Sequence, residues 1–109
     1  MLHRLLNRYW DWVEQRAMRD PNIVLLRQEL QTVGREYEAM PYEHLLQPAG
    51  VLSCRKVVNG LELSFAAEAT HVDQNGDIHF CIDARLPGSR WRWMPSYQFK
   101  KRRDGSVYY

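Results

Sequence analysis

The fold is decided by residues 61–86, LELSFAAEATHVDQNGDIHFCIDARL. Near the middle of this stretch is Asn75-Gly76. An Asn-Gly pair between apolar runs is a strong hairpin signal, because a type I′ turn needs positive φ at both central residues. On both sides of the pair, apolar residues recur with a period of two, as expected for strands with one buried face. The segment therefore predicts two antiparallel strands, 61–72 and 77–86.

Three more turns extend this hairpin into a meander. Asn59-Gly60 and Asp104-Gly105 repeat the hairpin signal, and Pro87-Gly88-Ser89-Arg90 predicts a looser turn. Because each of these turns reverses the chain, we expect neighbouring strands to pair in antiparallel order. The additional strands that these turns predict are 51–58, 91–101 and 106–109.

The residues before Pro48 show a helical period instead. The pair Asp20-Pro21 divides this region, since Asp is a good N-cap and Pro suits the first position of a helix. A second helix is therefore predicted to begin at Pro21 and to end near Pro41. The apolar residues of the first helix recur at three- and four-residue steps; they are Leu2, Leu5, Leu6, Tyr9, Trp10, Val13 and Ala17.

These elements predict an α+β fold with two N-terminal helices packed on one face of a four- to five-stranded antiparallel meander sheet. A chain of 109 residues is expected to form one domain, 1–109, with 1–47 helical and 51–109 in the sheet. The apolar runs are far shorter than the roughly 20 residues that a membrane span needs, so we expect no membrane partner. Charged residues interrupt 1–18, which argues against a secretory signal.

The turns also predict a register. If Asn75-Gly76 forms a two-residue loop, Phe80 lies opposite His71 on the buried face and Glu68 lies opposite Asp83 on the open face. The terminal hairpin, treated in the same way, places Lys101 opposite Tyr108, within reach of a cation–π contact.

The two cysteines are predicted to stay apart. Around Asn59-Gly60, the same rule places Cys54 opposite Phe65 on the buried face, whereas Cys81 is on the open face. A disulfide between opposite faces is geometrically excluded. We therefore expect two reduced thiols in a cytoplasmic protein, with no structural zinc and no other metal.

Positive charge is concentrated in the last quarter of the chain. Residues 85–109 hold seven basic residues and one acidic residue, a balance of +6, whereas the preceding 84 residues have a balance of −4. Such a polarised molecule attracts an anionic partner from a distance. Arg, Trp and Tyr, which dominate binding hot spots, occur in the same region. The predicted partner-binding residues are Arg90, Arg92, Lys101, Arg102, Arg103 and Tyr108.

The open face of the sheet offers a second candidate. Two like charges facing each other, Glu68 and Asp83, persist where a cation lies between them or where one carboxyl is kept protonated. His79 and Arg85 share this face. The plain interpretation is a solvated surface, and the functional one is a polar site formed by Glu68, His79, Asp83 and Arg85.

No catalytic motif and no cofactor-binding motif occurs in the sequence. We therefore expect a non-enzymatic protein–protein interaction module (an adaptor, inhibitor or immunity-type protein) that presents its basic, aromatic C-terminal hairpin to an acidic protein surface. One alternative is a single-stranded nucleic-acid-binding domain, in which Trp91 and Trp93 join the patch as stacking platforms. A second alternative is a small-molecule binder or enzyme with a pocket between sheet and helices. The sequence leaves open whether the protein forms a homodimer.

Overall fold

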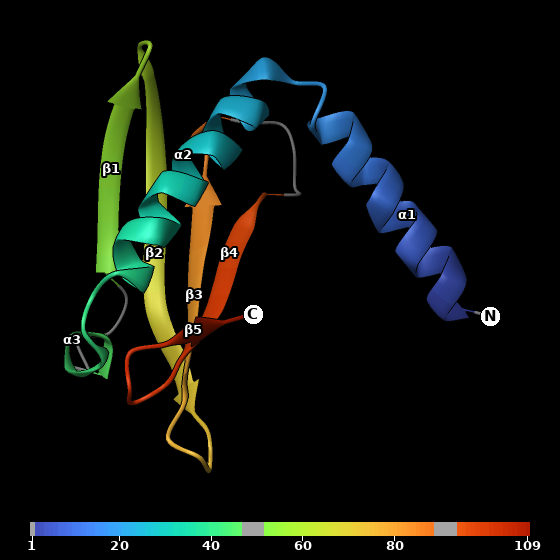
Figure 1. Cartoon of the computed structure of the whole chain (residues 1–109). Helices are drawn as coiled ribbons and strands as arrows, with labels where there is room; N and C mark the ends of the chain where they lie inside the picture. The colour runs from blue at the N-terminus through green and yellow to red at the C-terminus, as the bar shows by residue number, and fades with distance from the viewer. Residues whose placement is uncertain (1, 47–51, 89–93) are drawn as a thin grey trace.

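A computed structural model describes residues 2–46, 52–88 and 94–109, with side chains from residue 5 onward (Figure 1). The chain is an α+β protein whose helices precede one antiparallel sheet, and the strands are arranged in sequence order as a meander. The fold class expected from the sequence is thus confirmed. The elements are α1 (Leu2–Ala17), α2 (Pro21–Glu38), α3 (Tyr42–Leu46), β1 (Leu52–Val58), β2 (Leu61–Val72), β3 (Ile78–Arg85), β4 (Ser96–Lys101) and β5 (Val107–Tyr108).

The pairing of β1 with β2 follows the predicted register. Asn59 and Gly60 both have positive φ, 52° and 79°, as the two-residue turn requires. Cys54 lies opposite Phe65. Cys54 and Cys81 are both free and lie on opposite faces of the sheet, because the neighbours of Cys81 on β3 are the buried Phe80 and Ile82.

The predicted register of β2 with β3 is wrong by two residues, and the loop gives the reason. The Asp73 carboxylate accepts the N–H groups of Asn75 and Asp77 at 2.9 and 3.0 Å, and the Asp73 N–H donates to the Asp77 carbonyl. The loop therefore has three residues, with Gly76 as the one at positive φ. The longer loop shifts the pairing by one residue, and an irregularity between Ala69 and His71 shifts it by one more.

This shift of two residues leaves most side chains on their predicted faces but changes their partners. Phe80 lies opposite Ala69 instead of His71, and Glu68 lies opposite Cys81 instead of Asp83. Beyond the irregularity His71 is exposed and pairs with His79, so the expectation of a core histidine is wrong.

The terminal hairpin repeats the three-residue loop. The Arg102 N–H donates to the Ser106 carbonyl, and Gly105 has a positive φ of 91°. As a result Lys100, and not Lys101, lies opposite Tyr108, while Lys101 lies opposite Val107.

The core lies between α2 and one face of the sheet (Figure 1). Helix α2 begins at Pro21, and the Asp20 carboxylate accepts the Asn22 N–H at 3.0 Å, as an N-cap does. The helix lies over β2, β3 and β4. Its buried apolar side chains meet alternate residues of these strands. The fully buried cluster includes Leu26, Leu30, Val33, Phe65, Ile82 and Phe99.

Gly34 allows α2 to approach β4 closely. A Cβ at Gly34 would lie 2.6 Å from the ring of Tyr97, which is too close for any real contact. The Tyr97 ring is also held in place, because its hydroxyl donates to Glu38 Oε1 at 2.7 Å. The glycine, which as a helix residue is unfavourable, is therefore explained by packing.

Gly34→Ala is expected to destabilise the protein by about 1–3 kcal/mol, because the added methyl group overpacks the α2–β4 contact. Helix propensity alone would give the opposite sign, a stabilisation of up to about 1 kcal/mol. Urea unfolding followed by circular dichroism measures the difference, with Gln28→Ala on the exposed side of α2 as the control. A Gly34→Ala protein more stable than wild type would contradict the contact.

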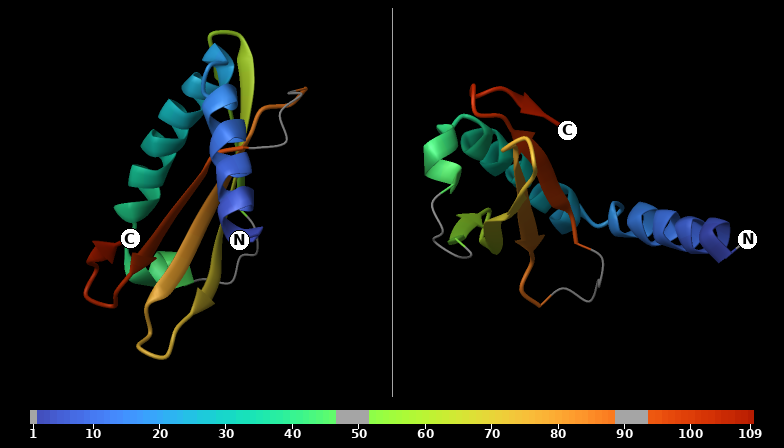
Figure 2. Two further views of the ribbon diagram at one scale, coloured as in Figure 1. Left: turned by 90° about the vertical axis from the view of Figure 1, so that its right-hand side faces the viewer. Right: turned by 90° about the horizontal axis from the view of Figure 1, so that it is seen from below.

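Helix α1 does not lie on the sheet, which corrects the expectation that both N-terminal helices pack there. It extends away from the body of the molecule on the β4 side (Figures 1 and 2). Only its last turn is anchored, through the buried Ala17 and an ion pair of 3.9 Å between Glu14 and Arg27 of α2. The part of the sheet face formed by β2, β3 and β4 is already covered by α2. Among the described helices, none is both long and apolar enough to cross a membrane.

Candidate functional site

The C-terminal hairpin lies beside the β2–β3 turn at one end of the sheet (Figure 1). Arg103 lies against Gly76 of that turn, since a Cβ at Gly76 would be 2.5 Å from Arg103 Nε. Tyr108 joins the two turns as well, because its hydroxyl donates to Asp77 Oδ2 at 2.6 Å. The hairpin is therefore held by side-chain contacts as well as by the two-residue strand β5.

Lys101 is not part of the accessible surface, which corrects its assignment as a partner-binding residue. Its side chain faces the core and only 4% of it is exposed. The Lys101 ammonium donates to the carbonyl oxygen of Glu38 at 2.5 Å. Glu38 ends α2, so Lys101 satisfies a helix-terminal carbonyl and places positive charge at the negative end of the helix dipole.

Lys101→Met is expected to lower the free energy of unfolding by about 1–3 kcal/mol, because the Glu38 carbonyl loses its buried donor. Lys100→Met serves as the control, since the neighbouring lysine faces the open side and makes no such bond. Guanidinium unfolding of both variants makes the comparison. Equal stability of the two variants would show that Lys101 does not hold α2.

The two arginines of the hairpin loop are exposed and preorganised. The Arg102 guanidinium lies 4.3 Å from the centre of the Tyr108 ring, and the Lys100 ammonium lies 5.3 Å from it. The expected cation–π contact between Lys101 and Tyr108 is therefore wrong, and Arg102 and Lys100 contact the Tyr108 ring instead. Arg90 and Arg92 lie outside the described residues, as do Trp91 and Trp93.

Arg85 is remote from the hairpin. Arg85 is the last residue of β3, whereas Ile78, the first residue of that strand, pairs with Lys101 of β4. The eight residues of β3 separate the two sites by roughly 25 Å at the rise of an antiparallel strand. The basic residues that are close in sequence are therefore divided between two ends of the sheet.

The acidic residues near the hairpin are bound to groups of the chain itself. Asp104 accepts the N–H and the hydroxyl of Ser106 at 2.8 and 2.6 Å. These bonds hold the pKa of Asp104 below its usual value. Asp77 accepts the Tyr108 hydroxyl, which raises the pKa of that phenol. In contrast, the ion pairs found among the described residues include neither Arg102 nor Arg103.

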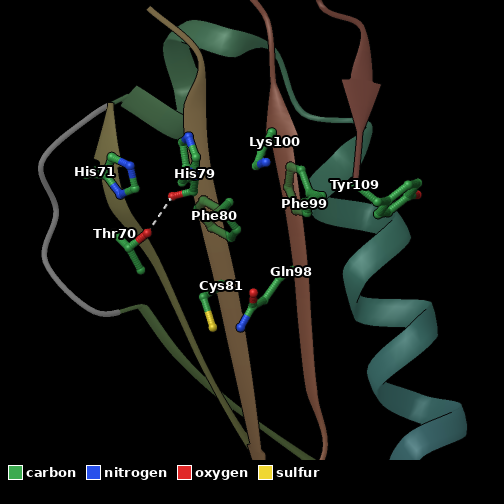
Figure 3. A pocket seen from close by; sticks show the side chains of 9 residues that line it. All are labelled: Thr70, His71, His79, Phe80, Cys81, Gln98, Phe99, Lys100 and Tyr109. Atoms are coloured by element: carbon green, nitrogen blue, oxygen red, sulfur yellow. Dashed lines mark hydrogen bonds between the residues drawn. The ribbon is translucent and has the colours of Figure 1, made fainter. Parts of the chain in front are cut away.

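The open face of the sheet contains a cavity of about 380 Å³ (Figure 3). Of the four residues predicted to form a polar site, only His79 lines it. Glu68 and Asp83 are not facing residues, and Asp83 and Arg85 line a separate hollow with Pro87 and Met94. The carboxylate pair on which that prediction depended is therefore absent. The residues that line the cavity are Thr70, His71, His79, Phe80, Cys81, Gln98, Phe99, Lys100 and Tyr109.

His79 is oriented by the loop residue Asp73. Its Nε2 lies 3.1 Å from Asp73 Oδ2, and its ring stacks on that of His71 with the centroids 3.9 Å apart. The bond to His79, together with the backbone N–H groups of Asp77 and Asn75, lowers the pKa of Asp73. The stacked pair was not predicted, because it depends on the irregularity in β2.

Asp73→Asn is expected to destabilise the fold most near neutral pH and progressively less in acid. Because the folded state lowers the pKa of Asp73, its carboxylate stabilises the protein above the unfolded-state value of about 3.9. That stabilisation is lost as pH falls through the lower pKa of the folded state. Urea unfolding at several pH values measures the effect, with Asp11→Asn in the exposed part of α1 as the control. A difference between Asp73→Asn and wild type that grows as the pH falls would contradict this assignment.

Cys81 is poorly suited to nucleophilic chemistry. Burial and then the nearby Asp83 carboxylate raise the pKa of its thiol, whose Sγ lies 3.7 Å from Asp83 Oδ1. A raised pKa keeps the thiol protonated, whereas nucleophilic attack needs the thiolate. Within the described ranges, no group of three or more His, Cys, Asp and Glu side chains is arranged to hold a metal ion.

Comparisons with known proteins add no assignment. No protein-family model, no curated protein and no solved structure matches this chain.

Proposed function

We propose that this protein is a small non-enzymatic protein–protein interaction module whose C-terminal hairpin binds an acidic surface of a partner protein. The observation that carries the proposal is the pairing pattern at the hairpin. Arg102 and Arg103 make no ion pair with any described carboxylate, while Asp77 and Asp104 are bound by the chain's own hydroxyl and N–H groups. Arg102 Nη1 donates to Ser106 Oγ at 3.4 Å. A guanidinium has five N–H donors, so both arginines keep donors for carboxylates of another protein.

Preorganisation supports the same proposal. Arg102 is held over Tyr108, and Tyr108 is fixed by its bond to Asp77. Binding then loses little side-chain entropy, which is one of the main costs of association. Tyr109 adds an aromatic side chain that is 76% exposed beside this surface. Arg and Tyr are among the residue types that contribute most to interface energies.

The charge distribution suggests how such a partner is found. Exposed cations at one end of a small molecule steer an acidic surface toward them and increase the association rate, with an effect that falls with salt. An adaptor, an inhibitor and an immunity-type protein all need this kind of fast, specific docking.

The nucleic-acid alternative has less support from the described residues. Single strands are held on open aromatic faces beside a cationic groove. At the hairpin, the Tyr108 ring is already covered by Arg102 and Lys100. Tyr109 is then the exposed aromatic side chain of the hairpin. The small-molecule alternative expects a pocket between sheet and helices, where the structure has packed core side chains. The cavity on the open face lacks the Glu68–Asp83 pair that suggested a site.

The double variant Arg102→Glu with Arg103→Glu is expected to lower partner affinity at least tenfold, because two favourable charge contacts become repulsive. The test is a pull-down from the native host, followed by measurement of Kd with the purified partner at rising salt. Arg19→Glu with Arg55→Glu is the matched control, since it makes the same change in charge at two exposed positions away from the hairpin.

Two results would count against the proposal. One is a partner that binds the hairpin variant as tightly as wild type. The other is capture that disappears after nuclease treatment, combined with quenching of tryptophan fluorescence by a single-stranded oligonucleotide, which would favour the nucleic-acid alternative.

A further inference from the structure

Helix α1 carries an apolar stripe that the described part of the chain leaves exposed to water. Five large side chains of this stripe are each more than half exposed: Leu5 67%, Leu6 51%, Tyr9 56%, Trp10 52% and Trp12 53%. Single exposed apolar residues are normal, but a contiguous set that includes two tryptophans marks an interaction surface. The stripe belongs to a regular helix whose last turn is anchored on α2, so it is presented to something outside the chain.

A second apolar surface without a cover lies on strand β1. Leu52 and Cys54 face the same side as Ala67 and Phe65, their buried partners on β2, yet Leu52 is 46% exposed and Cys54 is exposed as well. Lys56 pairs with Glu29 of α2 at 3.4 Å. Tyr37, in the last turn of α2, is close enough to Cys54 for that thiol to add to the effect of burial in raising the Tyr37 pKa. Among the described residues, the beginning of β1 is therefore covered only in part, and Leu52 is left half-exposed.

The stripe and the open part of β1 cannot meet within one chain. Helix α1 leaves the body on the β4 side, and β1 forms the opposite edge of the sheet (Figures 1 and 2). Backbone bonds from Arg19 and Asp20 back to the end of α1 make the connection to α2 a tight turn. Because α2 lies between the two surfaces, α1 can reach β1 only in another molecule.

A second copy of the chain fits the stripe better than a membrane does. Helix α1 has three basic residues, Arg4, Arg8 and Arg16, and two acidic ones, Asp11 and Glu14, a balance of only +1. Helices that bind anionic lipid are rich in Lys and Arg on the polar face. Arg16 also lies 5.0 Å over the Trp12 ring, on the stripe itself. A second copy, in contrast, supplies the missing cover for both surfaces.

The stripe offers an area on the scale that a stable dimer needs. Three half-exposed aromatic rings and two leucines offer on the order of 500 Å² of surface in each copy. If each stripe covers a similar area of the other copy, a two-fold exchange buries roughly 2,000 Å², the upper end of the standard range for stable interfaces.

We propose that the protein forms a two-fold symmetric homodimer in which α1 of each copy packs its stripe over Leu52 and Cys54 of the other copy. The exchange is reciprocal, so it closes and leaves no stripe exposed. The homodimer does not use the hairpin residues Arg102 and Arg103. Failure of the dimer proposal would therefore leave the function proposed for these arginines unaffected, and the reverse also holds.

The first test is the mass of the full chain in solution, measured by light scattering after gel filtration and by sedimentation. Wild type is expected to be a dimer at tens of micromolar, and Trp10→Glu is expected to raise the dimer dissociation constant at least tenfold. Gln15→Glu, the same charge change on the polar side of α1, is expected to remain dimeric. Circular dichroism of Trp10→Glu checks that the sheet is retained. A monomeric wild type, with or without binding to vesicles that contain anionic lipid, would overturn the proposal.

The second test locates the contact. Leu6→Cys in a Cys81→Ser background is expected to be linked to the native Cys54 of the other copy by a short bismaleimide. The matched control moves the acceptor to the other face of β1, with Cys54→Ser and Val57→Cys, and is expected to give no such link. A dimer whose Leu6→Cys residues link only to each other would contradict the exchange, since it would place the two α1 helices together.

Discussion

The close contact between α2 and β4 is the constraint on which the rest of the structure depends. Gly34 lets the helix come within contact of the Tyr97 ring, and two bonds then hold the end of the helix: Tyr97 to the Glu38 side chain and Lys101 to the Glu38 carbonyl. Tyr109 donates to the same Glu38 side chain and so ties the chain end to this point. The position of α2 determines which part of the sheet is covered, and therefore which surfaces remain for partners.

Most of the fold could be predicted from the sequence, because turn residues and periodicity are local signals. Asp20-Pro21 marks the beginning of α2, and Asn59-Gly60 fixes the register of β1 with β2. The other two hairpins were misjudged because an aspartate changes the loop. In DQNGD (73–77) the Asp73 carboxylate accepts the N–H groups of Asn75 and Asp77, and in RRDGS (102–106) the Asp104 carboxylate accepts the N–H of Ser106. These bonds favour a three-residue loop over a two-residue loop. A glycine preceded by such an aspartate is a signal that could have given the correct register.

The candidate sites were harder to predict, since they depend on long-range packing. Lys101 looks like a surface lysine in a basic run, but the alternation of β4 turns it toward α2 and buries it. The supposed Glu68–Asp83 pair disappears with a shift of two residues, whereas His71 and His79 come together through an irregularity that no composition reveals. The amphipathic pattern of α1 was correctly identified, but the pattern alone does not say which molecule covers the apolar side.

Native-state hydrogen exchange of the full chain tests the central claim most directly. If α2 is clamped to β4, its amides between Leu26 and Val33 should exchange as slowly as those of β3, and only through global unfolding. Their opening free energies should then equal the free energy of unfolding measured with denaturant. Exchange of α2 through a local opening well below that value, while β2, β3 and β4 stay protected, would contradict the account.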